Sequence, residues 1–311
     1  MRTPSSSAAL RAALLVVVVL AATACSGASG IDADMLEPDS FGTLPSDVDY
    51  VALGDSYSAG PLITTIRSDP SGCVRSTDNY PAFLAGWLSV ATYTDVTCSG
   101  ADTRDLISRQ RLLDGKRVAP QLDALAADTD LVTLGIGGND FGIFSSLIDC
   151  VEGCSPGRQR GLLRAAGRVE QRVAGAVRAI AKRAPEAEIY VVGYPQVLPE
   201  QETCPAVALP PAQLAAAARI ALRLNDSLRA GSEAEGASYV DLGPASQGHD
   251  VCAGKAAWIN GPQLRLGIAA PFHPMLAGMR GVAGEVFAAV TGEEAPAGER
   301  AAPPRDSLVR N

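Results

Sequence analysis

The sequence predicts an α/β protein with a mostly parallel sheet in a single domain. Three observations predict this class. Short, nearly continuous apolar runs recur along the chain, as they do in strands buried on both faces of a parallel sheet. Amphipathic helical stretches lie between such runs. The alternation of the two patterns, without a visible internal repeat, is typical of parallel sheets with crossover helices.

Five strands are predicted from short runs rich in β-branched residues. They cover residues 49–53, 92–97, 131–136, 189–192 and 238–242. Three helices are predicted from apolar residues at spacings of three and four. The first covers residues 161–185 and ends at Pro185, the second has an apolar face from Leu214 to Leu228 that we expect Gly231 to stop, and the third covers residues 275–290.

Composition and charge exclude two classes of protein. The chain has 311 residues, of which 47% are hydrophobic, and a net charge of −8. This apolar content suffices for a buried core and excludes disorder of the whole chain. Because nucleic-acid binders are normally basic, the negative charge disfavours nucleic acid as a partner. No pattern suggests a coiled coil or an obligate partner, and we expect a monomer.

The first residues are typical of an export signal. Arg2 and Arg11 precede an apolar run of eleven residues, 12–22, which is too short to span a bilayer as a helix. The sequence Ala-Thr-Ala-Cys at 22–25 resembles a bacterial lipobox, although Leu is commoner at its first position. We therefore predict a signal peptide over 1–24 and lipidation of Cys25, with ordinary secretion after cleavage near Ala24 as the alternative.

The predicted processing leaves an acidic chain with three further parts. Loss of residues 1–24 removes two arginines and changes the net charge from −8 to −10, so membrane attachment would come from acyl chains on Cys25 rather than from the net charge. Residues 25–46 are predicted to be a flexible tether, residues 47–292 the folded domain, and residues 293–311 a disordered tail.

Six cysteines remain once Cys25 is set apart. In an exported protein an even number indicates disulfides, and six cysteines allow fifteen pairings. A metal site is disfavoured, because Cys150 and Cys154 have no second closely spaced Cys or His pair to complete a tetrahedral set.

Polar or glycine residues follow the predicted strands at the edge where parallel strands end. Ser56 follows the first strand, Gly100 the second and Asn139 the third, while His273 precedes the last helix. Each alone is equally well explained as a cap or a turn residue. Because ligands bind beyond the carboxyl ends of such strands, the four together predict one site.

Only two histidines are available as a base for a serine nucleophile. His249 lies in a polar loop beside Cys252, where a solvated surface position is expected. His273 lies between Phe272 and Pro274 at a helix entrance, which is a better-ordered location. His273 is therefore the favoured base.

Together these residues resemble the SGNH subclass of the GDSL-type lipases and esterases, over nearly all of residues 47–290. The first block reads GDSYS rather than GDSL, and GGND about eighty residues later is the more specific signal. The resemblance implies a flavodoxin-like SGNH hydrolase fold, which is a three-layer α/β/α sandwich with a mostly parallel five-stranded sheet. It also implies Ser56 as nucleophile, His273 as base, and an oxyanion hole from the Ser56 and Gly100 N–H groups and the Asn139 side-chain amide, without metal or cofactor.

The resemblance is greatest to secreted actinobacterial esterases and lipases with three disulfides paired in sequence order. Carried over to this chain, it implies Cys73–Cys98, Cys150–Cys154 and Cys204–Cys252. The first would hold the Ser56 and Gly100 loops together. The last would hold the loop that leads toward His273.

One position departs from the family pattern. Many members carry an Asp three residues before the catalytic His, where this chain has Ala270. We expect the main-chain carbonyl of Ala270 to orient the imidazole, with the Asp250 carboxylate as the less favoured alternative. A thousandfold loss of activity in Asp250→Ala would refute this expectation.

The predicted function is hydrolysis of carboxylic esters, with lipid or other acyl esters as substrates. The alternatives are a carbohydrate acetylesterase of the same fold and a lipid-anchored binding protein without catalysis. An α/β-hydrolase is disfavoured because no G-x-S-x-G motif occurs, and GIGGND lacks the spacing of a dinucleotide-binding loop. Phe141, Phe144 and Tyr194 are candidate walls of an acyl pocket, and each is equally well explained as core.

Overall fold

The computed structural model describes residues 47–297, apart from residue 113 and residues 151–152 and 201–202. The predicted signal peptide, the tether with Cys25, and residues 298–311 of the predicted tail lie outside the described residues. Residues 293–297 of that tail are described, and the Ala297 carbonyl accepts a hydrogen bond from Arg280 at 2.7 Å. No helix in the described ranges is long and apolar enough to cross a membrane.

Five parallel strands form one sheet, as the sequence predicts. They are β1 (Asp49–Gly54), β2 (Thr92–Asp95), β3 (Leu131–Gly135), β4 (Glu188–Val192) and β5 (Ser238–Val240). Their order is β2-β1-β3-β4-β5, and every pairing is parallel. The chain therefore moves outward from β1 in one direction to β2 and in the other to β3, β4 and β5. The carboxyl ends of β1 and β3 are adjacent, with Gly54 paired to Gly135.

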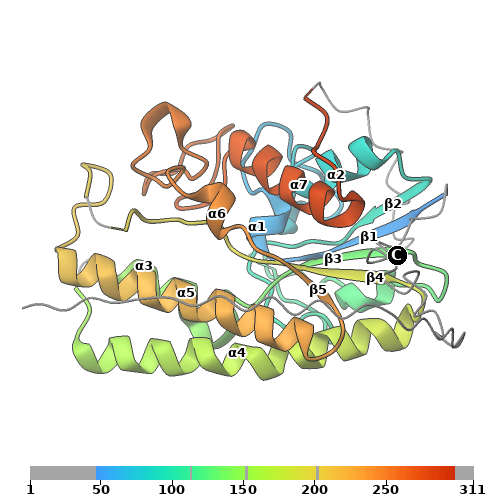
Figure 1. The fold of residues 1–311 in the computed structure, drawn as a ribbon, viewed down its shortest axis with the longest axis horizontal. Helices are drawn as coiled ribbons and strands as arrows, with labels where there is room; N and C mark the ends of the chain where they lie inside the picture. The colour runs from blue at the N-terminus through green and yellow to red at the C-terminus, as the bar shows by residue number, and fades with distance from the viewer. Residues whose placement is uncertain (1–46, 113, 151–152, 201–202, 298–311) are drawn as a thin grey trace, which may run out of the picture. The chain divides into compact units, whose positions relative to one another are not determined.

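Helices cover both faces of this sheet, which makes three layers (Figure 1). The long helices α4 (Pro156–Arg183) and α5 (Pro211–Glu233) pack on one face, and α2 (Tyr80–Leu88) and α7 (Leu276–Thr291) pack on the other. Shorter helices are α1 (Ser56–Ala59), α3 (Ile143–Asp149) and α6 (Gly243–Ser246). This architecture confirms the predicted α/β/α fold class.

Alternate residues of β1 supply the two layers of the core. Val51 and Leu53 pack with the α4 and α5 side, whereas Tyr50 and Ala52 pack with the α2 and α7 side. Because successive side chains of a strand point to opposite faces, a strand that is buried on both faces reads as a continuous apolar run. That is the pattern from which the strand was predicted.

The predicted end of the second long helix is wrong. Helix α5 continues past Gly231 to Glu233. A Cβ atom at Gly231 would lie 2.4 Å from the Glu170 carbonyl oxygen of α4, so the glycine permits the close approach of the two helices rather than ending one of them.

Three disulfides join the described loops: Cys73–Cys98, Cys150–Cys154 and Cys204–Cys252. These are the pairs that the family resemblance implies. Cys98 also donates its N–H to the Gly54 carbonyl at the end of β1. The first disulfide therefore lies between the loops that follow β1 and β2.

Candidate active site

Ser56 is the first residue of α1, immediately after β1. The preceding residue, Asp55, caps this short helix by accepting the Tyr57 N–H at 2.8 Å. Ser56 is only 7% exposed. A strand that turns into a capped helix within two residues fixes the direction of the hydroxyl, which is what a nucleophile requires.

The turn into α1 depends on glycines on two strands. A Cβ atom at Gly54 or at Gly135 would lie 2.4 Å from the Ser58 hydroxyl, so both positions must be glycine for α1 to pack against the sheet. The buried side chain of Gln121 completes the main-chain hydrogen bonding here. It accepts the Gly54 N–H at 2.7 Å and donates to the Gly54 carbonyl at 2.9 Å.

His273 lies against Ser56, with 2.8 Å between Nε2 and the Ser56 hydroxyl oxygen. The other ring nitrogen, Nδ1, is 2.7 Å from the Pro271 carbonyl oxygen. A carbonyl can only accept, so Nδ1 carries the hydrogen and Nε2 presents its lone pair to the serine. Burial lowers the pKa of His273, although the bond to Pro271 opposes this shift. The imidazole is therefore neutral at pH 7 and able to take the serine proton.

The expectation that Ala270 orients the imidazole is wrong. Its carbonyl instead accepts the His273 N–H at 3.2 Å and the Asn260 amide at 3.1 Å. The turn made by the first of these bonds brings the Pro271 carbonyl to Nδ1. The orienting group is a main-chain carbonyl, as expected, but it belongs to the next residue.

The Asp250 carboxylate forms no hydrogen bond or ion pair with His273 in the described part of the chain. It accepts the Cys252 N–H at 2.7 Å within its own loop. The second histidine, His249, is also separate from Ser56: its Nδ1 contacts the Ala256 carbonyl at 2.6 Å, and its ring stacks on Trp258. The structure therefore pairs Ser56 with His273, the base that the sequence favours.

The loops carrying Gly100 and Asn139 are joined to each other. The Asn139 side-chain amide donates to the Ala101 carbonyl at 2.9 Å, which leaves its second N–H free to bind another group. Next to it, the buried Asp140 carboxylate accepts the Thr103 hydroxyl at 2.6 Å and the Thr103 N–H at 3.0 Å. These bonds hold the second and third candidate segments as one unit.

Two main-chain N–H groups of the candidate segments have no acceptor among the described residues. Within the described residues, neither the Ser56 N–H nor the Gly100 N–H forms a hydrogen bond. Gly100 has a φ of 81°, a left-handed conformation that favours glycine. Free donors near a nucleophile are the requirement for stabilising an oxyanion.

A buried tyrosine links the nucleophile loop to the Asn139 loop. The Tyr194 hydroxyl donates to the Asp55 carboxylate at 2.6 Å and accepts the Gly138 N–H at 2.8 Å. Burial raises the pKa of Asp55 to about 7, against the opposing effects of its bonds from Tyr194 and Tyr57. The hydroxyl therefore connects the residue before Ser56 with the residue before Asn139.

A second tyrosine links the nucleophile helix to the histidine loop. The Tyr57 hydroxyl donates to the Phe272 carbonyl at 2.6 Å, and its ring lies 5.0 Å from the His273 ring. The Tyr57 ring also packs against Phe144 and Tyr194. Tyr57 and Tyr194 thus support the segments that carry Ser56, Asn139 and His273.

No sequence pattern indicated that Gln121, Tyr57 and Tyr194 support the site. Their partners are distant in sequence, 67 residues away for Gln121 and Gly54 and 139 for Tyr194 and Asp55. No local motif marks such contacts. Only Tyr57, which lies next to Ser56, could have been singled out by its position.

The candidate acyl-pocket residues have different surroundings. The Arg168 guanidinium lies over the Phe141 ring, with 4.0 Å between the guanidinium carbon and the ring centroid. Phe144 packs against Tyr194, and a Cβ atom at Gly138 would overlap its ring. Phe144 and Tyr194 therefore pack against the loop that carries Asn139 and support it.

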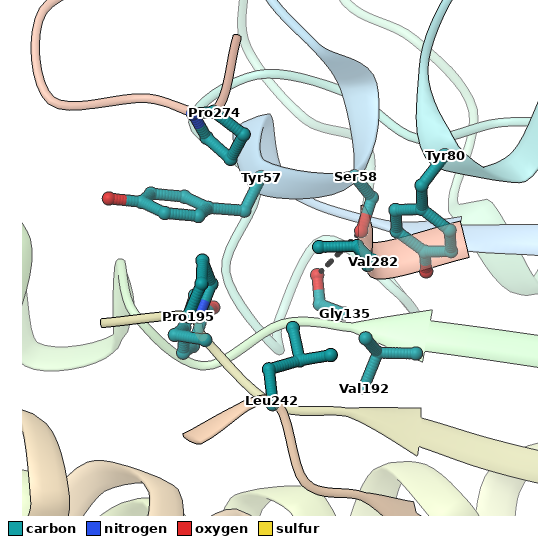
Figure 2. A pocket seen from close by; sticks show the side chains of 11 residues that line it. Tyr57, Ser58, Tyr80, Gly135, Val192, Pro195, Leu242, Pro274 and Val282 are labelled. Atoms are coloured by element: carbon teal, nitrogen blue, oxygen red, sulfur yellow. Dashed lines mark hydrogen bonds between the residues drawn. The ribbon is translucent and has the colours of Figure 1, made fainter. Parts of the chain in front are cut away.

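Figure 2 shows a small pocket lined by Tyr57, Val192 and Leu242. Tyr194 also lines this pocket. The Ser58 hydroxyl points across it to the Gly135 carbonyl (Figure 2). Neither Ser56 nor His273 lines the pocket, so it is separate from the reactive pair. Among the described residues, no group of three or more His, Cys, Asp or Glu side chains could hold a metal ion.

Comparisons with known proteins converge on one family. Residues 52–280 match the model of the GDSL-like lipase/acylhydrolase family. The chain is 37% identical to Lipase 2 of Streptomyces coelicolor, over 76% of this chain and 83% of that protein. It is 32% identical to a lipase of Streptomyces rimosus, over 73% and 80% of the two chains.

Two solved structures are similar to this one. The extracellular lipase of Streptomyces rimosus has a TM-score of 0.68 at 28% identity, covering 78% of this chain and 99% of that one. Phospholipase A1 of Streptomyces albidoflavus has a TM-score of 0.66 at 30% identity, covering 80% and 100%. The family match over residues 52–280 includes both Ser56 and His273.

Proposed function

The chain belongs to the GDSL-like lipase/acylhydrolase family and is a carboxylic ester hydrolase, and from this premise we propose that it cleaves lipid or other acyl esters with Ser56 and His273 as a catalytic dyad. One observation carries the proposal. His273 Nε2 lies 2.8 Å from the Ser56 hydroxyl, while Nδ1 donates to the Pro271 carbonyl. This geometry supports a neutral imidazole with its lone pair directed at the serine.

The proposed reaction begins with transfer of the Ser56 proton to His273 Nε2. The serine oxygen forms a bond to the ester carbonyl carbon, and the carbonyl π electrons move to the oxygen. The tetrahedral intermediate collapses as the C–O bond to the alcohol breaks, and His273 returns the proton to the leaving oxygen. Water then attacks the acyl-serine by the same steps and releases the acid.

The oxyanion of each intermediate needs donors that are already in place. We assign this role to the N–H groups of Ser56 and Gly100 and to the free amide hydrogen of Asn139. The absence of protein acceptors for both main-chain donors within the described residues supports this assignment. Loss of one such donor costs about a hundredfold or more in rate, or roughly 3 kcal/mol.

The Pro271 carbonyl takes the place of the acid of a triad. It fixes the tautomer and ring orientation of His273 and places a negative dipole end toward the imidazolium that forms during the reaction. A carbonyl carries only a partial charge. We therefore expect it to stabilise the imidazolium less than a carboxylate would.

We also propose that the protein acts outside the cytoplasm, attached to the membrane through acylated Cys25. Three disulfides support an oxidising compartment. Mass spectrometry of the mature N-terminus tests this: a diacylated Cys25 is expected, and an unmodified chain cleaved near Ala24 would contradict it.

A chain-length series of p-nitrophenyl esters tests the enzymatic proposal. We expect hydrolysis to extend from acetate to longer acyl chains, and Ser56→Ala to reduce kcat by about 10⁴-fold or more. Ser58→Ala, two residues along the same helix, is the matched control and should retain activity. Activity confined to acetate would favour the acetylesterase alternative, and full activity of Ser56→Ala would contradict the dyad.

A further inference from the structure

Exposed aliphatic side chains gather in sequence around the candidate catalytic residues. Within the described residues, the exposed large hydrophobic side chains are Ile107, Ile148, Leu222, Leu264, Leu266 and Leu276. All but Leu222 lie within about ten residues of Gly100, Asn139 or His273. Ile107 and Ile148 lie on segments that follow β2 and β3, whose carboxyl ends are at one edge of the sheet. Leu264, Leu266 and Leu276 flank His273 in the sequence.

The most exposed pair lies in the loop that ends at the catalytic histidine. Leu264 is 62% exposed and Leu266 is 76% exposed. The buried Asn260 side chain closes this loop by donating to the carbonyls of Gln263 and Ala269 at 3.0 and 2.9 Å. The base of the loop is therefore fixed while its tip presents two leucines to solvent.

Two further contacts place this tip relative to the reactive pair. The Gly267 carbonyl accepts the Thr64 N–H from the segment that follows α1, at 3.4 Å. The loop then runs into Pro271, whose carbonyl holds His273. The tip is thus tied both to the nucleophile side and to the histidine side of the site.

Positive charge accompanies the exposed aliphatic residues. Arg265 lies between the two leucines, and residues 261–272 contain no acidic side chain. On the Gly100 segment, Arg109 and Arg111 are exposed near Ile107. None of these three arginines forms a salt bridge with a described residue. The chain as a whole carries a net charge of −8, so the positive segment 261–272 differs in sign from the chain that carries it.

We propose that the tip formed by Leu264, Arg265 and Leu266 docks on the surface of an anionic phospholipid bilayer and brings the site to ester bonds held there. The leucines enter the boundary between headgroups and acyl chains, and the guanidinium stays at the level of the phosphates. A second copy of the chain fits less well, because a symmetric contact would bring the two Arg265 side chains together. The inference rests on the proposed ester hydrolase function.

Vesicle binding tests this docking surface. The full chain carrying Cys25→Ser, which cannot be acylated, is mixed with vesicles of phosphatidylglycerol or of phosphatidylcholine, and binding is measured by flotation. Ser56→Ala is added in this arm so that the vesicles remain intact. The test variants are the double variant Leu264→Ser/Leu266→Ser and the single variant Arg265→Gln.

Helix α5 offers matched controls away from the loop. Leu222 is 64% exposed, close to the value for Leu264, and Arg219 is exposed one turn earlier on the same helix without a salt bridge to a described residue. Leu222→Ser and Arg219→Gln remove the same chemical groups. Both controls should bind vesicles within about twofold of the parent.

The parent is expected to bind phosphatidylglycerol vesicles at least tenfold more tightly than phosphatidylcholine vesicles. Each leucine should contribute on the order of tenfold to this affinity, so the double variant should lose about a hundredfold. Arg265→Gln should lose about fivefold on the anionic vesicles alone. The proposal would be overturned if the double variant bound as well as the parent, or if the α5 controls lost as much affinity as the loop variants. It would also be overturned if the parent sedimented as a dimer and only the double variant was a monomer.

Hydrolysis of a soluble ester separates this inference from the enzymatic proposal. With Ser56 restored, the loop variants should hydrolyse p-nitrophenyl butyrate with kcat/KM within about twofold of the parent. Failure of every form to hydrolyse it would refute the hydrolase while leaving vesicle docking standing. Normal hydrolysis with no vesicle binding by the parent would refute docking alone.

Discussion

Replacing Tyr194 by Phe removes the hydroxyl that joins Asp55, before the nucleophile, to Gly138 of the Asn139 loop. The ring would still pack against Tyr57 and Phe144. What is lost is the acceptor of the Gly138 N–H, at 2.8 Å, and the donor to the buried Asp55 carboxylate, at 2.6 Å. Each buried group left without a partner costs about 1–3 kcal/mol, so we expect a loss of about 2–5 kcal/mol in the free energy of unfolding.

The pH dependence of this loss identifies its cause. Burial raises the pKa of Asp55 to about 7, above its value in the unfolded chain, so the folded state holds this proton more tightly and its stability declines as the pH rises toward 7. Without Tyr194 the ionised carboxylate keeps only the Tyr57 N–H as a donor. The loss in Tyr194→Phe should therefore be larger at pH 8 than at pH 5.

Urea unfolding at both pH values, together with hydrolysis of p-nitrophenyl butyrate, provides the assay. Because the Asn139 loop loses its support, kcat should fall about 10- to 100-fold while KM changes less than about threefold. Tyr239→Phe is the control, since its buried hydroxyl has no hydrogen-bond partner in the described part of the chain. A stability loss below about 0.5 kcal/mol with an unchanged kcat in Tyr194→Phe would refute the supporting role.

Three further predictions follow from the histidine and the disulfides. The pKa of His273 is lowered by burial and catalysis needs the neutral ring, so kcat/KM should rise with pH to a plateau with a midpoint below 6.5; a midpoint above 7 would contradict this. Asp250→Ala should keep kcat within about threefold, and a thousandfold loss measured with the same ester would restore Asp250 as the orienting acid. Replacing both cysteines of Cys204–Cys252, which are 48 residues apart, by Ser should cost about 4 kcal/mol in urea unfolding, whereas removing Cys150–Cys154, which spans four residues, should cost about 2. The reverse order would contradict the loop-entropy argument.

The strands and the reactive pair could be predicted because both leave local marks in the sequence. Each buried strand is a short apolar run, and the residues after β1 and β3 form compact motifs that contain Ser56 and Asn139. His273 followed from the scarcity of histidines as much as from its motif. For the strands, Ser56 and Asn139 the information lies within a few consecutive residues.

Contacts between distant segments could not be predicted in the same way. Gly231 looked like a helix end because glycine is a poor helix former, and only its contact with the Glu170 carbonyl explains why α5 tolerates it. The Ala270 carbonyl was expected to orient His273, but a turn closed by the His273 N–H and the Ala270 carbonyl brings the Pro271 carbonyl to the ring instead. Tyr194 and Gln121 act through partners far away in sequence, where periodicity and motifs carry no signal.

Labelling with a fluorophosphonate probe tests the central claim, that Ser56 is a nucleophile activated by His273, most directly. The probe forms a covalent bond only with an activated serine, and peptide mass spectrometry locates the adduct. We predict an adduct on Ser56 in the full chain and in Ser58→Ala, and none in Ser56→Ala or in His273→Ala. An adduct on another residue, or equal labelling of Ser56→Ala, would contradict the account.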